Sequence, residues 1–254
     1  MKKIEIVNMP GYTSSYYVLA LSKSGYKLHV KPEKKFEKYN YATCLLIRID
    51  GKLIVIDNDD PLRVIEDLYE ESTVYFMTNK AIDKPEFNRD GIYPLFPHYP
   101  VNTLWLYIKL FHWHLMKPNM LKKALTVLYT VYTRPKYVNF ALNHSKKRYV
   151  FFAARFWKKE KVANEWRLAF MEACTRIKEL HFEGGFQLRK DITYPEGFEK
   201  YVNTKSYNPP EFSRKSSESI VVFNNPAVKD AISWRVAEYL NAGKAIISVP
   251  FKME

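Results

Sequence analysis

The sequence lacks the features that mark a secreted, disulfide-bonded or membrane-spanning chain. Cysteine is scarce: Cys44 and Cys174 are the only two in 254 residues, and their spacing fits neither a disulfide framework nor a metal site. There is no apolar run of about 18 residues, the length that crosses a bilayer. The N-terminus reaches Glu5 before the apolar core of a signal peptide can form. We therefore expect a cytoplasmic chain in a reducing compartment.

Acidic residues are scarce in one quarter of the chain. The formal net charge is +13, and residues 101–160 contain 12 Lys and Arg against a single acid, Glu160. A localised positive field implies an anionic partner, which can be a phosphate ligand, a nucleic acid or an anionic membrane. The length of 254 residues is enough for two ordinary domains.

A strand–helix–strand unit is predicted at the N-terminus. Residues 3–7 form the first strand, a serine-capped helix ends near Ser22, and residues 26–30 form the second strand. This opening is typical of a Rossmann-like unit, although the glycine-rich dinucleotide fingerprint is absent. Gly11 follows the first strand, and we expect it to line the ligand cleft because ligands bind at the carboxyl ends of such strands.

A β-hairpin and a helix are predicted next. The apolar runs 44–49 and 52–56 enclose an Asp-Gly pair, which is a strong hairpin signal. The acids within 57–60 either bind a metal or cap a helix over 61–71. The proline that follows them suits the first helical turn and favours the cap. Residues 73–77 form the next strand.

The segment 91–100 holds three prolines and His98, and it is predicted to be extended at the rim of a sheet. An isolated histidine is more often structural than catalytic. A histidine in a cleft can also bind a phosphate or the hydroxyl of an acceptor.

Residues 103–133 carry more apolar side chains than one helical stripe requires, mixed with lysines. Aromatic and basic side chains on helices are typical of a surface that lies on a membrane. Much of this segment is also expected to be core. Stacking on nucleic acid is a further alternative, but no nucleic-acid motif accompanies it.

A basic linker over 134–148 divides the chain into two predicted domains, residues 1–140 and 141–254. The second begins with a strand over 149–153, a basic turn, and a helix over 164–177. Strand, basic turn and helix N-terminus form a phosphate site, to which Arg155 and Lys161 add charge. The alternative is a solvated basic loop.

The last part of the chain is predicted to be a helix that leads into a strand. Apolar residues within 236–240 form the helical stripe, Gly243 ends the helix, and residues 245–249 form a buried strand. Residues 181–186 and 219–223 are two further strands, the former with a glycine turn. Glu238 stands among the apolar residues of the helix, where a carboxylate needs a partner.

Segments from both halves resemble bacterial GT-B glycosyltransferases, especially those of surface-polysaccharide gene clusters. In the first half these are residues 49–61 and 95–101. In the second they are residues 151–161, 182–186 and the stretch that contains Ala-Glu-Tyr-Leu-Asn-Ala-Gly-Lys-Ala-Ile-Ile, residues 237–247.

The resemblance implies two Rossmann-like domains that face each other across a cleft. The second domain would bind a nucleotide-diphosphate sugar without a metal or cofactor. Arg155 and Lys161 match the residues that contact the diphosphate, and Glu238 matches the one that binds ribose or phosphate. Asp230 lies eight residues earlier and matches the paired acid only approximately. The first domain would hold a glycan or lipid-linked acceptor, with 103–133 against the membrane.

The resemblance departs from the family pattern at the C-terminus, because the chain stops just after the glycine and strand. We therefore expect an incomplete second domain. The predicted function is transfer of a hexosyl unit from a nucleotide-diphosphate sugar, with His98 as a weak catalytic candidate and no nucleic-acid partner. The alternatives are a non-catalytic binding module and, more weakly, a nucleic-acid-binding protein.

Overall fold

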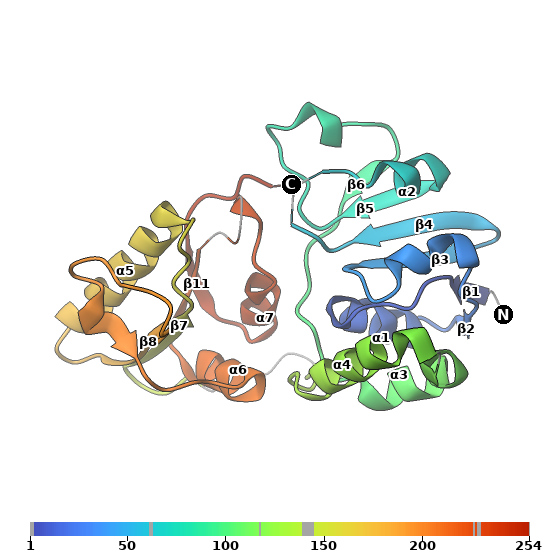
Figure 1. Cartoon of the computed structure of the whole chain (residues 1–254). Coiled ribbons are helices and arrows are strands. Elements are labelled where there is room, and N and C mark those ends of the chain that lie inside the picture. Colours follow the sequence, from blue (N-terminus) through green and yellow to red (C-terminus); the bar gives the residue numbers. More distant parts are fainter. Residues whose placement is uncertain are drawn as a thin grey trace. The chain divides into compact units, whose positions relative to one another are not determined.

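The computed structural model has an α/β fold and divides into two compact units (Figure 1). The first comprises residues 1–137 and 252–254, and the second residues 138–251. The structure describes residues 3–60, 63–116, 118–138, 145–225, 227 and 230–253. The predicted domain boundary after residue 140, the predicted cap proline Pro61, and Pro226 and Glu254 lie outside the described residues.

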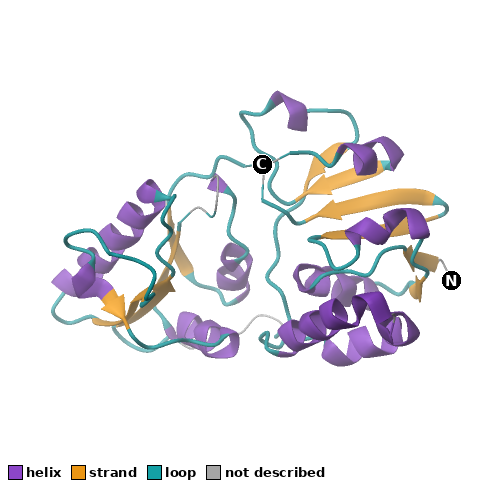
Figure 2. Cartoon of the chain, viewed as in Figure 1, coloured by secondary structure: helices purple, strands orange, loops and turns teal. Residues whose placement is uncertain are grey.

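The first unit is built on a mixed sheet with the strand order β2-β1-β3-β4-β5-β6. Strands are orange and helices purple in Figure 2. β3 runs antiparallel to both of its neighbours, whereas the other pairs are parallel. The strands are β1 (Lys3–Ile6), β2 (Lys27–Val30), β3 (Cys44–Ile49), β4 (Lys52–Asp57), β5 (Val74–Met77) and β6 (Ile92–Pro94).

The predicted hairpin is confirmed, and its turn explains the register. Asp50 and Gly51 have φ angles of 50° and 79°, so both occupy the left-handed region that a tight two-residue hairpin turn requires. Ile49 then lies opposite Lys52, and the pairing continues to Cys44 opposite Asp57. The predicted opening strand, helix and second strand are also present, with β1 parallel to β2.

Helices α1 (Ser15–Lys23), α3 (Leu104–Phe111) and α4 (Leu121–Tyr132) pack on one face of this sheet through a single apolar cluster. Ile4, Ile6 and Leu45 supply the strand side, while Tyr107 and Val131 are among the residues that supply the helix side. Burying side chains of this size contributes about 2 kcal/mol each. The first unit also contains helix α2 (Glu66–Glu71).

The helix predicted over 61–71 is shorter than expected, and the expected acidic cap is wrong. The helix begins at Glu66, and no side chain caps it. Instead, the buried carboxylate of Asp57 accepts hydrogen bonds from the Tyr75 hydroxyl (2.5 Å) and from the Asp59 backbone N–H (3.0 Å). Val64 is buried ahead of the helix. Tertiary burial therefore outweighs the local capping signal.

The described residues of the second unit form five strands, in groups of three and two. All of their pairings are parallel. The strands are β7 (Tyr149–Ala154), β8 (His181–Gln187), β9 (Val202–Asn203), β10 (Val221–Asn224) and β11 (Ala245–Ser248).

The two groups meet where the start of β10 lies beside β7. The Ile220 N–H donates to the Tyr149 carbonyl (2.9 Å), and the Lys146 N–H donates to the Glu218 carbonyl (2.7 Å). From the Lys146–Glu218 contact to the Tyr149–Ile220 contact, the residue number rises in both segments, from 218 to 220 in one and from 146 to 149 in the other. β7 and β10 therefore run in the same direction. The combined order is β9-β8-β7-β10-β11, which is the 3-2-1-4-5 order of a Rossmann-like sheet.

Helices cover both faces of these strands. Phe152 of β7 packs with Phe170 of α5, whereas Phe151 points the other way and packs with Phe212 of α6. The helices are α5 (Lys161–Arg176), α6 (Pro209–Glu218) and α7 (Arg235–Asn241), the first of which begins three residues earlier than predicted. The sequence reading gave no helix at α6, although Asn208 caps it by accepting from the Glu211 N–H (2.9 Å).

The predicted glycine turn after residue 182 is wrong. Gly184 and Gly185 lie inside β8, with φ angles of 129° and 124°. A Cβ at Gly184 would lie 2.0 Å from the Phe152 carbonyl oxygen, and one at Gly185 would lie 2.3 Å from that of Tyr201. Glycine is therefore required by close strand packing rather than by a turn.

Candidate functional site

The strand order of the second unit predicts where a ligand binds. The chain leaves β7 toward the face covered by α5, and it leaves β10 toward α7, which packs with α6 on the opposite face. In open α/β sheets, ligands occupy the crevice outside the carboxyl ends of the strands at such a switch point. The segments that follow β7 and β10 therefore form the candidate site.

The turn after β7 is held by one buried side chain. Asn164 of α5 accepts a hydrogen bond from the Trp157 N–H (3.2 Å) and donates one to the Trp157 carbonyl (2.7 Å). Its side chain is 2% exposed. Both backbone groups of Trp157 are thus fixed to the first turn of the helix, which makes the turn after β7 rigid.

Arg167 brings a buried cation to this turn. Its Nη1 donates to the Arg155 carbonyl (2.7 Å) and to Asn164 Oδ1 (3.1 Å), and its guanidinium stacks on the Trp157 ring at 3.9 Å from the centroid. Arg167 is only 3% exposed. Its Nε is buried without a hydrogen-bond partner among the described residues, and no carboxylate described in the structure forms an ion pair with it.

A second arginine reinforces the positive charge. Arg235, the first residue of α7, stacks on the Phe212 ring at 3.5 Å from the centroid. Burial and, to a smaller extent, the charge of Arg235 lower the pKa of Arg167 to about 10, with Glu160 opposing. Arg167 is still protonated at neutral pH. Arg235 of α7 thus adds to the positive potential at Arg167 of α5. A buried charge of this kind is stabilised when an anion binds.

The sequence-predicted Arg155 and Lys161 both lie at this turn, but their side chains point to solvent. Arg155 is exposed, and its contribution to the buried network is its backbone carbonyl. The side chain of Lys161, the first residue of α5, is 89% exposed and lies 3.9 Å from Glu165. Lys161 therefore adds positive charge at the helix N-terminus without a fixed position.

Glu238 and Asp230 lie in the segment after β10. The Glu238 carboxylate accepts a hydrogen bond from the Ser213 hydroxyl of α6, which gives the acid the partner that its apolar surroundings require. Asp230 precedes α7 and has a φ of 62°. The two acids are therefore not on one helix.

Gly11 belongs to the first unit and is buried there. Its carbonyl accepts a hydrogen bond from the Tyr107 hydroxyl (2.9 Å), and a Cβ on Gly11 would lie 2.5 Å from the Ala42 carbonyl oxygen. The absence of a side chain at this position is therefore explained by packing after β1.

His98, also in the first unit, is stacked between aromatic rings. Its ring lies parallel to that of Tyr16, with an interplanar angle of 3°, and 4.8 Å from that of Tyr99. Burial lowers the pKa of His98 to about 4. The imidazole is therefore neutral at pH 7, where it accepts hydrogen bonds but is a weak general base.

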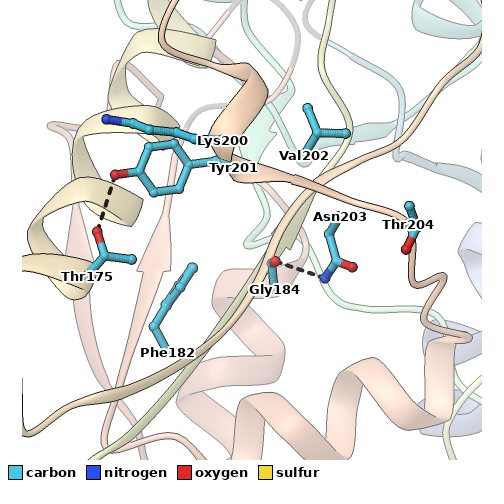
Figure 3. A pocket seen from close by; sticks show the side chains of 8 residues that line it. All are labelled: Thr175, Phe182, Gly184, Lys200, Tyr201, Val202, Asn203 and Thr204. Atoms are coloured by element: carbon cyan, nitrogen blue, oxygen red, sulfur yellow. Dashed lines mark hydrogen bonds between the residues drawn. The ribbon is translucent and has the colours of Figure 1, made fainter.

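A separate pocket of about 290 Å³ lies beside β8 (Figure 3). Thr175, near the end of α5, and Phe182, near the start of β8, line one part of it. Asn203 closes another part by donating to the Gly184 carbonyl (2.9 Å). The lining comes from α5, β8 and residues 200–204, and it includes none of the residues that follow β7 or β10. The pocket is therefore distinct from the switch-point site.

Sequence reasoning missed Arg167 and Arg235. An arginine within a long helix is usually solvated, so only tertiary burial distinguishes Arg167 from its neighbours. A weak signal was present, because Asn164 and Arg167 are three residues apart and share a helix face just after the basic turn.

Comparison with known proteins gives no relative. No family model matches the chain, and no curated protein and no solved structure matches it.

Proposed function

We propose that the chain is a GT-B-type glycosyltransferase that moves a hexosyl unit from a nucleotide-diphosphate sugar to a glycan or lipid-linked acceptor. The observation that carries the proposal is the buried guanidinium of Arg167, which forms no ion pair with a described carboxylate and lies at the switch point of a Rossmann-like sheet. The resemblance of segments 151–161 and 237–247 to donor sites of this enzyme type supports the same assignment.

The diphosphate is the part of the donor that fits this site best. It carries two adjacent negative charges, and arginine guanidinium groups bind phosphate oxygens through paired N–H donors. The N-terminus of α5 favours an anion through its free N–H groups and its dipole. Arg155 and Lys161 are free to turn toward the bound phosphates because both side chains are exposed.

These cations have a chemical task as well as a binding task. Transfer of the sugar leaves negative charge on the departing nucleoside diphosphate, and fixed positive charge lowers the energy of the transition state in which that charge develops. Arg167 is held by Asn164 and Trp157 before the ligand arrives, so little reorganisation is needed.

The remaining predicted residues have secondary roles in this proposal. Glu238 accepts hydrogen bonds from ribose or sugar hydroxyls, in exchange for the one from Ser213, and Asp230 assists it. His98 binds a hydroxyl of the acceptor as a neutral imidazole. Gly11 allows the chain after β1 to pack closely.

The proposal is tested with UDP, GDP and their common sugars, in a thermal-shift screen followed by an assay for transfer or hydrolysis of the sugar. We expect one nucleotide to raise the melting temperature and its sugar to be turned over. Arg235→Ala should weaken the shift at least tenfold in apparent affinity, whereas Arg176→Ala, at the far end of α5, should not. A folded protein that binds no nucleotide would refute the donor site.

A further inference from the structure

Helix α4 presents two apolar stripes, and only one of them is used by the fold. Ala124, Val127 and Val131 are buried in the core of the first unit. Leu125 and Tyr129 belong to a second stripe at helical spacing and are 57% and 69% exposed. Leu121 and Tyr132 extend this stripe at the two ends of the helix, with exposures of 44% and 60%. A helix that only had to cover the sheet would carry polar residues there.

The neighbouring helical segment adds to this apolar surface, since Trp113 and Met116 line the same groove as Leu121 and Leu125 of α4. Trp105 of α3 and Trp113, just after it, are 79% and 78% exposed, and Met116 is 69% exposed. Between this segment and α4 lies an apolar groove of about 510 Å³, lined on one side by Ile108 and on the other by Leu128. Exposed apolar areas that form one continuous surface mark an interaction site rather than ordinary surface variation.

The charged residues that this segment itself carries are all positive. No Asp or Glu occurs between residues 91 and 159. Lys122 and Lys123 are exposed on α4 beside the apolar stripe, and Lys109 is exposed on α3. The partner is therefore apolar at its centre and anionic at its margin. A second copy of this chain does not satisfy this requirement, because its own lysines would meet these lysines.

We propose that the α3–α4 surface, residues 105–116 and 118–132, docks on a bilayer that contains anionic lipids. The exposed stripe of α4 enters the boundary between headgroups and acyl chains, Trp105 and Trp113 lie at the headgroup level, and Lys122 and Lys123 contact lipid phosphates. The groove accommodates part of one aliphatic chain. Among the described residues no helix is long and apolar enough to span a bilayer, so the contact is peripheral. This inference does not rest on the proposed transferase activity.

The experiment is co-sedimentation of the full chain with phosphatidylcholine vesicles, with and without phosphatidylglycerol. We expect binding to the anionic vesicles and much weaker binding to the neutral ones. Leu125→Glu combined with Tyr129→Glu should abolish binding, whereas Trp166→Glu, which alters an exposed apolar residue of α5, should not. Lys122→Gln with Lys123→Gln should weaken binding to anionic vesicles by on the order of tenfold.

A second measurement locates the contact and keeps the test independent of folding. Brominated lipids should quench tryptophan fluorescence in the wild type and less in Trp105→Phe with Trp113→Phe. Absence of binding to anionic vesicles overturns the proposal, as does binding that survives the Leu125 and Tyr129 changes. Dimerisation or RNA binding that these changes abolish, without vesicle binding, would assign the surface to that partner instead.

Discussion

Buried polar side chains at the carboxyl edges of the two sheets differ in whether they find partners within the chain. In the first unit, the Asn8 amide donates to the carbonyls of Tyr39 and Cys44 and accepts from the Leu46 N–H, so all of its bonds are made within the chain. At the corresponding edge of the second unit, Arg167 is equally buried but has no described carboxylate partner. A satisfied polar group holds the fold, whereas an uncompensated one indicates a ligand.

The second unit contains its own contrast, because the buried ammonium of Lys215 is paired with a half-buried carboxylate. Glu183 of β8 accepts from Lys215 (2.8 Å) and from the Tyr149 hydroxyl (2.7 Å). Burial alone would raise the pKa of Glu183, but these hydrogen bonds and the charge of Lys215 lower it to about 2.

The largest effect is expected for Glu183→Gln, which leaves the buried ammonium of Lys215 without a carboxylate. We expect the free energy of unfolding of the second unit to fall by about 3 kcal/mol in urea titrations. Glu218→Gln is the matched control. It removes a carboxylate whose partners Lys146 and Arg214 are exposed, so it should cost less than about 1 kcal/mol. Equal losses of unfolding free energy in Glu183→Gln and Glu218→Gln would contradict the expectation that the paired buried charge matters more.

Asn8→Ala should have the next largest effect. It removes three hydrogen bonds and leaves the buried Leu46 N–H without its Asn8 partner, whereas the Tyr39 carbonyl keeps the Ala42 N–H (3.3 Å). We expect a loss of about 2 kcal/mol, confined to the first unit. Nucleotide binding in the second unit should be unchanged. Differential scanning calorimetry with and without nucleotide measures both the loss of stability and the binding of nucleotide. If nucleotide no longer raised the melting temperature of the variant, the edge of the first unit would also be part of the donor site.

Arg167→Met should have a smaller effect on stability and a larger one on binding. The change removes two hydrogen bonds but also relieves the burial of an unpaired charge and its repulsion by Arg235, so we expect a change in unfolding free energy of less than about 1 kcal/mol. Inorganic phosphate should raise the melting temperature of the wild type and not that of the variant. A loss as large as that of Glu183→Gln would indicate a structural role for Arg167.

The smallest predicted effect is a difference in the response of the units to acid. His98 has a lowered pKa of about 4, so the stability it contributes is full above the unfolded value near 6.5 and is lost as the pH falls from there to 4. The contribution of Glu183 is full above its ordinary pKa of 4.5 and is lost as the pH falls toward 2. The first unit should therefore weaken at a higher pH than the second. His98→Phe keeps the aromatic stack and should remove the earlier loss in pH-dependent urea unfolding.

Local signals were sufficient to predict the parts of the fold that depend on neighbours in sequence. Asp50 and Gly51 set the hairpin because their own backbone angles define the turn. The signal for α6 is equally local, since Asn208 is followed by two prolines and Glu211, although this helix is not among the predicted elements. The acids at 57–60 do not form the predicted helix cap, because the hydroxyl of Tyr75, which is distant in sequence, donates a hydrogen bond to the Asp57 carboxylate.

The candidate site was only partly predictable for the same reason. The basic turn with Arg155 and Lys161 is visible in the sequence, since it lies between a strand and a helix. The buried state of Arg167 depends on Trp157 and Asn164, and its proximity to Arg235 depends on the pairing of β7 with β10. No sequence pattern reports contacts made across a sheet.

Calorimetric titration of the wild type and of Arg167→Met with UDP and GDP tests the central claim most directly. We predict that one of the two binds the wild type with an exothermic, salt-sensitive isotherm, and that Arg167→Met weakens it by at least tenfold while Arg176→Ala leaves it unchanged. Equal affinity for the wild type and Arg167→Met, or no binding to the folded wild type, would contradict a diphosphate site at the switch point.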